Sequence, residues 1–227
     1  MNDYLDLVEM GIPQRKRMFE LTRSFYRNFL GNKRGNKVLE LGCGDGVLTQ
    51  ELHSVDSTIS PTLIDGSREM LNKARKRFDG REGFHFIETT FEELIESAVE
   101  LPKFDLVISS LAIHHLPMVK KKSLFQYIYS HLNEGGYFVN IDCVLPPNGA
   151  LERWYLNLWE EWLVDRCSDK TQVDQFVKQI YDHHMEEEHH RNLDTLDSQL
   201  RALGEIGYKE VDCIFKEGVL TIYYGKR

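Results

Sequence analysis

Residues 37–46 read Lys-Val-Leu-Glu-Leu-Gly-Cys-Gly-Asp-Gly, and no other stretch of the chain is as informative. Its apolar residues predict a short strand, its three glycines spaced two apart predict a tight turn, and residues 47–53 predict a helix. Such a turn lets a cofactor approach the backbone, because no side chain blocks its way. No Gly-Lys-Ser/Thr ending follows, and the third glycine comes one residue earlier than in the dinucleotide fingerprint. The turn therefore predicts an α/β protein whose cofactor is not held in the manner of the phosphate binders.

Strand and helix patterns alternate after this turn. The next strand, 62–64, ends at Asp65, about twenty residues after the glycines, which is near the spacing of an acid that binds a ribose. Further strands are predicted at 84–88, 104–110 and 137–144, and helices with apolar stripes at 70–78 and 117–132, the second closed by Gly135 and Gly136. This alternation predicts a doubly wound, parallel sheet.

The C-terminal part departs from this alternation. A helix is predicted at 198–206, followed by two extended runs, 211–215 and 219–224, on either side of Glu217-Gly218. A dipeptide of this kind between two apolar runs is typical of a hairpin turn. The pattern predicts an antiparallel strand pair at the end of the parallel sheet.

This ordered series resembles the class I S-adenosylmethionine-dependent methyltransferases. The carriers are apolar-apolar-acid-apolar-Gly-x-Gly-x-Gly at 38–46 and Asp-x-Ser-x-x-Met-Leu at 65–71, and the resemblance covers 37–145 and 196–227. It implies a Rossmann-like α/β fold with a doubly wound, mostly parallel seven-stranded sheet and a C-terminal antiparallel hairpin. It also implies S-adenosylmethionine as the cofactor and methyl transfer as the reaction.

The resemblance implies a set of cofactor-binding residues: Glu40, Gly42, Gly44, Asp65, Gly66, Ser67, Met70, Thr90, Phe91 and Ser109. Glu40 would orient the methionine end of the cofactor, and its alternative role is a strand-end carboxylate that caps the glycine turn. Asp65 would accept hydrogen bonds from both ribose hydroxyls, and its alternative role is a helix N-cap. Met70 would pack near the sugar and adenine or belong to the core. Backbone carbonyls around Ser109 would hold the cofactor's ammonium group.

The adenine end departs from the family pattern. Where the family carries an acid that accepts from the adenine amino group, this chain has Thr90, a weaker acceptor. Backbone groups or Glu92 are the alternative acceptors, and Phe91 is placed to stack on the purine.

The candidate catalytic residues are His114, His115 and Asp142. The two histidines follow the strand at 104–110, so one of them is expected to remove a proton from the acceptor. The alternative is that His115 packs under the sheet edge and orients the loop. Asp142, near the end of the strand at 137–144, would orient the substrate or that imidazole, or cap a helix.

Composition narrows the class of protein further. The chain has 227 residues, enough for one domain with a substantial core, and a net charge of −8, which argues against nucleic acid as a partner. No signal peptide and no apolar run of membrane-spanning length is present, and the four scattered cysteines fit reduced thiols. We expect a cytoplasmic protein that acts as a monomer or homodimer and does not bind membranes.

Two segments outside the core pattern are expected to define the acceptor site. Residues 1–35 predict an N-terminal helical lid, residues 36–145 and 196–227 the cofactor-binding core, and residues 146–195 a helical cap. The cap contains all three tryptophans, and one or two of its aromatic side chains are expected in the pocket: Trp154, Tyr155, Trp159, Trp162 and Tyr181. Because the cap follows the fifth strand, it would stand over the carboxyl edge of the sheet, where such folds bind ligands.

The run His-His-Met-Glu-Glu-Glu-His-His at 183–190 is unusual. Its His and Glu residues pair at i,i+4 spacing, which suits a divalent ion, but no His-Glu-x-x-His arrangement is present. We therefore expect no metal; a solvated helix face is favoured over a substrate-facing role for His183, His184 and Glu187. The sequence predicts a methyltransferase acting on an oxygen, nitrogen or other nucleophile of a small molecule. An enzyme that modifies the cofactor itself and a non-catalytic cofactor-binding regulator are the alternatives.

Overall fold

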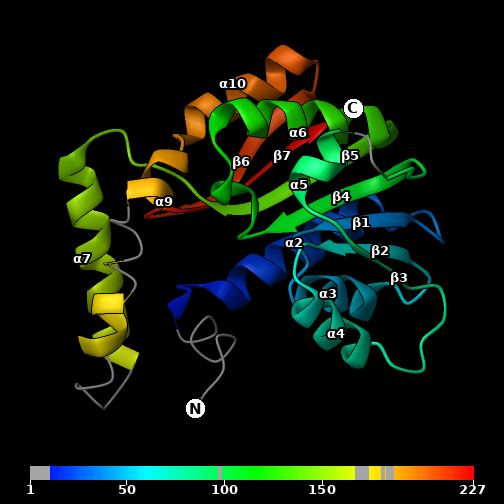
Figure 1. Cartoon of the computed structure of the whole chain (residues 1–227), viewed down its shortest axis with the longest axis horizontal. Coiled ribbons are helices and arrows are strands. Elements are labelled where there is room, and N and C mark those ends of the chain that lie inside the picture. The colour runs from blue at the N-terminus through cyan, green and yellow to red at the C-terminus, as the bar shows by residue number, and fades with distance from the viewer. Residues whose placement is uncertain (1–10, 97–98, 167–173, 180–181, 183–186) are drawn as a thin grey trace.

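The computed structural model describes residues 11–96, 99–166, 174–179, 182 and 187–227. A seven-stranded sheet in the order β3-β2-β1-β4-β5-β7-β6 forms its centre (Figure 1). The strands are β1 Lys37–Leu41, β2 Ser60–Asp65, β3 His85–Glu88, β4 Phe104–Ser110, β5 Leu132–Cys143, β6 Lys209–Glu217 and β7 Leu220–Lys226. The first five strands pair in parallel, and β7 pairs antiparallel to both β5 and β6. The predicted Rossmann-like sheet with its C-terminal hairpin is confirmed.

Helices cover both faces of this sheet, α5, α6 and α10 on one face and α2, α3 and α4 on the other (Figure 1). The helices are α2 Arg15–Phe29, α3 Val47–Val55, α4 Arg68–Arg77, α5 Phe91–Ile95, α6 Met118–His131, α7 Gly149–Arg166, α9 Glu187–Asn192 and α10 Leu196–Ile206, with a short 3-10 turn η1 at Ile113–His115. Because both faces are covered, the central strand β4 is buried along six of its seven residues. Within the described ranges, no helix combines the length and apolar character needed to cross a membrane.

One predicted boundary is wrong. Gly135 and Gly136 do not close the helix before them, because α6 ends at His131 and β5 already begins at Leu132. Leu132 pairs with Phe104, and the register then shifts before the regular pairing resumes. Gly135 has φ 76°, and a Cβ on Gly136 would lie 3.0–3.2 Å from three backbone oxygens. The two glycines therefore serve an irregular stretch of strand.

The predicted N-terminal helix is present as α2, two residues after Pro13. Met18 and Phe25 are buried, and the Phe25 ring meets the ring of Tyr137 on β5 edge-on at 5.2 Å. Phe29, predicted on the same apolar face, is 49% exposed, because the helix ends at its position. This helix packs along α3 over the sheet, and its first residue, Arg15, reaches the carboxyl edge. Residues 1–10 of the predicted lid lie outside the described residues.

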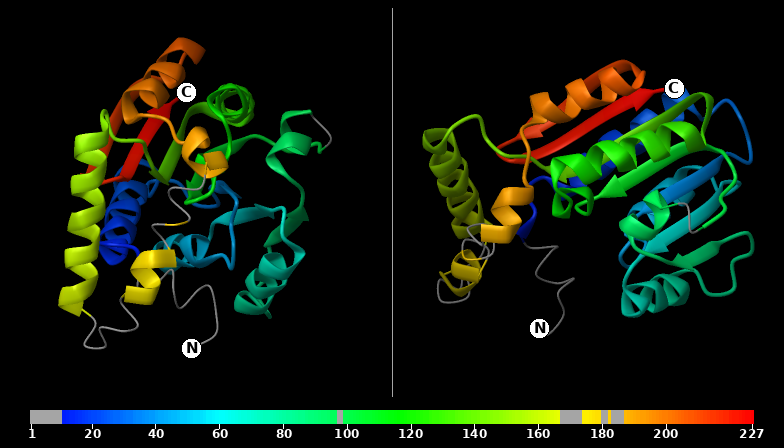
Figure 2. Two further views of the ribbon diagram at one scale, coloured as in Figure 1. Left: turned by 60° about the vertical axis from the view of Figure 1, so that its left-hand side comes forward. Right: turned by 45° about the horizontal axis from the view of Figure 1, so that its top comes forward.

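Helix α7 stands apart from the sheet at one end of the molecule (Figure 2). The ring of Tyr155 lies 4.6 Å from Lys216 Nζ, which ties α7 to the β6–β7 hairpin. The indole N–H of Trp159 donates to the Gly11 carbonyl at 2.7 Å, and Trp154 is 53% exposed. Of the predicted cap, residues 167–173, 180–181 and 183–186 lie outside the described residues, among them Tyr181, His183 and His184.

Candidate functional site

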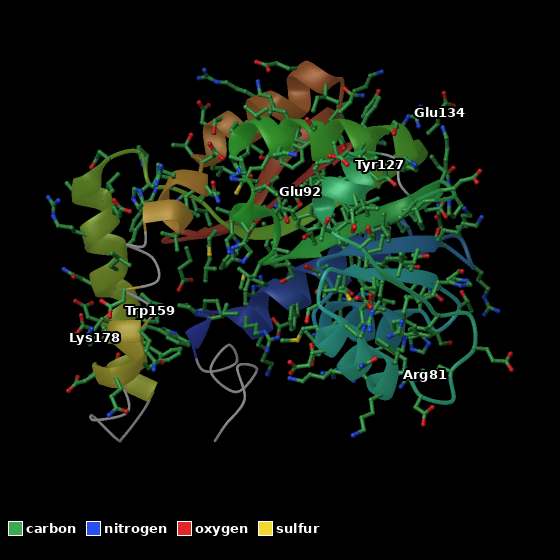
Figure 3. The ribbon with its side chains drawn as sticks, viewed as in Figure 1. Arg81, Glu92, Tyr127, Glu134, Trp159 and Lys178 are labelled. Atoms are coloured by element: carbon green, nitrogen blue, oxygen red, sulfur yellow. The ribbon has the colours of Figure 1, made fainter. Side chains whose placement is uncertain are left out.

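A cavity of about 540 Å³ opens at the carboxyl ends of β1, β2 and β4. Nine of the thirteen predicted site residues line it: Glu40, Gly42, Gly44, Asp65, Gly66, Met70, Thr90, Phe91 and His115. Ser67, Ser109, His114 and Asp142 do not. No described residue of the predicted cap lines the cavity, and Figure 3 shows Trp159 on α7 well apart from Glu92, which does line it.

The two glycines of the turn are required for different reasons. Gly42 has φ 63°, and a Cβ there would lie 2.3 Å from the Cβ of Ala112, so only a glycine lets the loop after β4 pack against the turn. Gly44 has φ 53°, but an added Cβ would meet nothing within 4 Å and would point into open space. A side chain at Gly44 would therefore fill part of the cavity.

Two backbone N–H groups hold the Asp65 carboxylate in place. Its Oδ2 accepts from the Gly44 N–H at 2.8 Å, and its Oδ1 accepts from the Ser67 N–H at 2.8 Å. Each oxygen keeps a further lone pair for a ligand, which suits two neighbouring hydroxyl groups. The N-cap of α4 is Ser67, whose hydroxyl accepts from Met70 N at 3.3 Å, so the alternative role considered for Asp65 belongs to Ser67.

Glu40 is 1% exposed, although it lines the cavity. Its Oε2 accepts from the Thr49 N–H at 3.1 Å and from the Thr49 hydroxyl, so it braces the start of α3. Burial raises the pKa of this carboxyl to about 8. A cationic ligand group beside Glu40 would favour the ionised carboxylate and lower that pKa.

At the expected adenine end, Thr90 is the N-cap of α5. Its hydroxyl accepts from Glu93 N at 3.2 Å, and the Glu93 carboxylate accepts from the Thr90 backbone at 2.8 Å, a complete capping box. Phe91 and Glu92 follow on the same turn and line the cavity. The weak acceptor that sequence suggested is thus occupied with helix capping, and Glu92 supplies a carboxylate two residues later.

The end of β4 brings Ser110, and not Ser109, to the cavity. The Ser109 side chain is fully buried and its hydroxyl donates to the Leu41 carbonyl at 2.8 Å, which ties β4 to β1. Ser110 is the serine that lines the cavity. Leu111, also at the cavity, has φ 52°, and its N–H donates to the Ile141 carbonyl at 2.8 Å. A leucine in the left-handed region is strained, and such strain concentrates at functional sites.

The three candidate catalytic residues form one connected unit, of which only His115 reaches the cavity. His114 is buried, and its Nδ1 lies 2.5 Å from Oδ1 of the fully buried Asp142. The rings of His114 and His115 have their centroids 4.1 Å apart. Asp142 is held in turn by the Cys143 N–H at 3.0 Å and by the Asn140 amide at 3.1 Å. The buried pair thus lies behind the exposed imidazole of His115.

Several lining residues were not predicted from sequence. Arg15 comes from α2, and its guanidinium lies 5.1 Å from the centre of the Phe19 ring. Asp45, inside the glycine turn, is paired with Arg77 of α4, which also donates from Nε to the Asp45 carbonyl at 2.8 Å. The motif itself contained Asp45, but no sequence pattern linked Arg15 to a turn that lies more than twenty residues later.

No group of three or more metal-ligating side chains occurs among the residues that the structure describes. The chemistry of the cavity fits S-adenosylmethionine instead. Gly44 leaves open space beside the backbone, Asp65 presents two acceptors for a diol, and Glu40 places a carboxyl at the wall of the same cavity.

The chain is similar to known methyltransferases. A family model described as a methyltransferase domain matches residues 32–200. A malonyl-[acyl-carrier protein] O-methyltransferase of Paenibacillus sp. is 31% identical over 144 residues, 61% of this chain and 50% of that protein. A carboxy-S-adenosyl-L-methionine synthase of Campylobacter concisus is 25% identical over 80% of this chain and 73% of that protein. The structure of human N-acetylserotonin methyltransferase in complex with S-adenosylmethionine matches with a TM-score of 0.55 and 17% identity, over 100% of this chain and 62% of that one.

The chain belongs to the class I S-adenosylmethionine-dependent methyltransferases. Its cofactor is S-adenosylmethionine. The chain spans half the length of the malonyl-[acyl-carrier protein] relative.

Proposed function

We propose that this methyltransferase transfers the methyl group of S-adenosylmethionine to an oxygen or nitrogen of a small-molecule acceptor, with His115 as the general base. The observation that carries the proposal is the position of His115 in the same cavity as Glu40 and Asp65, with the His114–Asp142 pair behind it. An exposed imidazole at this place can take a proton from an acceptor at neutral pH.

The cofactor's sulfonium supplies an electrophilic methyl group, so the chain's own task is mainly alignment and proton removal. Asp65 would hold the ribose hydroxyls, and Glu40 would lie at the methionine end, where its carboxylate would favour the cofactor's positive charges. His115 accepts the acceptor's proton as the new bond forms. His114, bonded to Asp142, keeps the neighbouring backbone in place.

The apolar side chains around His115 favour a partly apolar acceptor that carries an O–H or N–H group. Leu111, Ala112 and Leu116 line the cavity on the same loop. Relatives named for methylation of malonyl-[acyl-carrier protein] and for ubiquinone biosynthesis act at oxygen, according to their names. Their acceptors differ, so we assign this chain the class of acceptor and not a single compound.

Modification of the cofactor itself is the second candidate. The carboxy-S-adenosyl-L-methionine synthase relative matches 80% of this chain, against 61% for the malonyl-[acyl-carrier protein] relative. The two functions leave different products. Transfer yields S-adenosylhomocysteine, whereas modification yields a heavier S-adenosylmethionine derivative.

The test is a screen of small O–H and N–H acceptors with mass detection of both the acceptor and the recovered cofactor. Transfer predicts S-adenosylhomocysteine together with an acceptor that has gained one methylene in mass. His115→Ala should lower the rate by about 10²–10⁴-fold with unchanged cofactor affinity. Asp65→Ala should instead weaken cofactor binding by about one to two decades, because a bidentate acceptor is lost. A heavier cofactor supports the second candidate, and no product of either kind supports a regulatory binding protein.

A further inference from the structure

The junction between α9 and α10 contacts the loop that carries the two histidines. Asn192, the last residue of α9, donates from its side-chain amide to the His115 carbonyl at 2.8 Å. This is a contact between the C-terminal end of the predicted cap, 146–195, and the only candidate catalytic residue that lines the cavity.

Two backbone bonds lie within the histidine loop. In the three-residue turn η1 the Leu116 N–H donates to the Ile113 carbonyl at 3.0 Å, and the His115 N–H reaches the Ala112 carbonyl at a long 3.4 Å. Leu111, just before it, has the strained φ of 52°. Contacts from other elements therefore help to keep this strained loop in one conformation.

Lys121 of α6 fixes the position of Asn192. Its side chain is fully buried, and its ammonium donates to Asp194 Oδ2 at 2.6 Å and to the Asn192 carbonyl. A buried ammonium must keep its partners, because an unpaired buried charge is strongly unfavourable. Lys121 therefore ties the residues between α9 and α10 to α6, next to the Asn192 side chain that bonds His115.

A second hydrogen-bond path runs from the same junction to His114. Gln199 donates to the Asp194 carbonyl at 3.3 Å and accepts from the Tyr223 hydroxyl at 2.6 Å. The Asn140 amide donates to the Tyr223 hydroxyl at 2.7 Å and to Asp142 at 3.1 Å. Asp142 in turn is bonded to the His114 ring. Both neighbouring histidines are thus supported from one junction, His115 through its backbone and His114 through its side chain.

The junction also connects to the cap helix. His190 Nε2 lies 2.9 Å from Glu152 Oε1, a contact between α9 and α7. His190 and Asn192 lie within one turn of α9, so the contact with α7 is two residues along this helix from the bond to His115.

We propose that Asn192 is a positioning residue, which holds the His115 backbone so that the imidazole faces the cofactor cavity and which couples the cap to it. The proposal rests on the proposed role of His115 as the base. Asn192 itself is partly exposed and does not line the cavity, so its substitution leaves the cofactor contacts untouched.

The test needs no acceptor. Protein with isotope-labelled histidine is saturated with S-adenosylhomocysteine, and the His115 imidazole signal is assigned by its loss in His115→Gln. Asn192→Ala, and Asn192→Asp with the same shape but no donor, should each shift that signal by more than its linewidth or broaden it. Affinity for S-adenosylhomocysteine should stay within about twofold of wild type, because the site lies elsewhere. Lys122→Ala is the matched control. Lys122 follows Lys121 on α6 but is exposed and pairs with Glu205 of α10, so its substitution should change neither quantity.

An unchanged His115 signal in both folded Asn192 variants overturns the proposal. If only one variant folds, as judged by circular dichroism, its signal decides. Once an acceptor is known, Asn192→Ala should lower kcat by about 10- to 100-fold, with KM for S-adenosylmethionine unchanged. The two proposals fail in different measurements. Absence of transferase turnover would contradict the proposed function, whereas an unchanged His115 signal would contradict the role of Asn192.

Discussion

Glu40 both supports the fold and lines the cavity. It braces α3 through Thr49 and lines the cavity, and its burial raises the pKa of the carboxyl from 4.5 to about 8. At neutral pH it is therefore largely protonated when no cationic group lies beside it.

The raised pKa predicts that stability of the ligand-free protein falls as pH rises. The folded state keeps the Glu40 proton up to about pH 8, whereas the unfolded state releases it near 4.5, so the folded state binds more protons between these values. Its stabilising effect is fully present below pH 4.5 and is lost as pH passes through 8. Urea unfolding between pH 5 and about 8.5 should show this loss in wild type and a flatter dependence in Glu40→Gln. Equal slopes in the two proteins would contradict the buried, protonated carboxyl.

Gly44 and Gly80 allow backbone strain to be separated from loss of ligand space. Both have positive φ, 53° and 72°, and an added Cβ meets nothing within 4 Å at either position. Gly44→Ala and Gly80→Ala should therefore each lower stability by about 1 kcal/mol, from strain alone. Only Gly44→Ala should also weaken S-adenosylhomocysteine binding in calorimetry, because only Gly44 faces the cavity. Equal affinities in the two variants would remove the glycine turn from the cofactor site.

At the scale of elements, α2 contributes more than a cover for the sheet. Its buried face packs along α3, and its first residue, Arg15, lines a cavity whose other lining residues include the acids Glu40, Asp45, Asp65 and Glu92. A cofactor with a carboxylate at its methionine end needs a cation in such surroundings.

Arg15→Gln should therefore weaken S-adenosylhomocysteine by about tenfold, because one charge-assisted hydrogen bond to a carboxylate is lost. Binding of 5′-methylthioadenosine, which lacks the amino acid part, should not change. Titration calorimetry with the two ligands measures the difference. Arg17→Gln is the control on the same helix, since Arg17 is exposed and pairs with Glu20. Equal weakening of both ligands would assign Arg15 to the fold and not to the carboxylate.

For the whole molecule, we propose a division of the described residues into a cofactor site on the sheet and a cap, residues 146–195, whose Asn192 contacts His115. Trp159 holds α7 to the start of the described chain at Gly11, and Asn192 holds α9 to His115. Because no described cap residue lines the cavity, the cap and the cofactor are expected to be largely independent.

Trp159→Phe tests this division. The substitution removes the indole N–H bond to the Gly11 carbonyl and keeps an aromatic ring against Phe176. S-adenosylhomocysteine affinity should stay within about twofold of wild type, while KM for the acceptor changes. Asp65→Ala gives the opposite pattern and serves as the control. A tenfold or greater loss of cofactor affinity in Trp159→Phe, near 1.4 kcal/mol, would show that the cap belongs to the cofactor site.

The sequence predicted the sheet, and eight of its ten candidate cofactor residues line the cavity, because periodicity and the glycine turn are local signals. It failed where a side chain's orientation depends on its neighbours. Ser109 points to Leu41 and leaves Ser110 at the cavity, and the Thr90 hydroxyl is used by the capping box. Arg15 lies far from the motif in the chain, so only packing of α2 against α3 brings it near. The division of work between His114 and His115 likewise required the position of Asp142.

The place of β7 in the sheet has a consequence for the order in which the site is completed. This strand lies between β5 and β6 although it follows both in the chain. Thr221 on β7 donates to the Asp142 carbonyl at 3.0 Å, and Tyr223 bonds Asn140. During translation the glycine turn and the histidines leave the ribosome well before these residues. A nascent chain can therefore form the cofactor turn early, whereas the support of His114 through Asp142 waits for the last strand to insert.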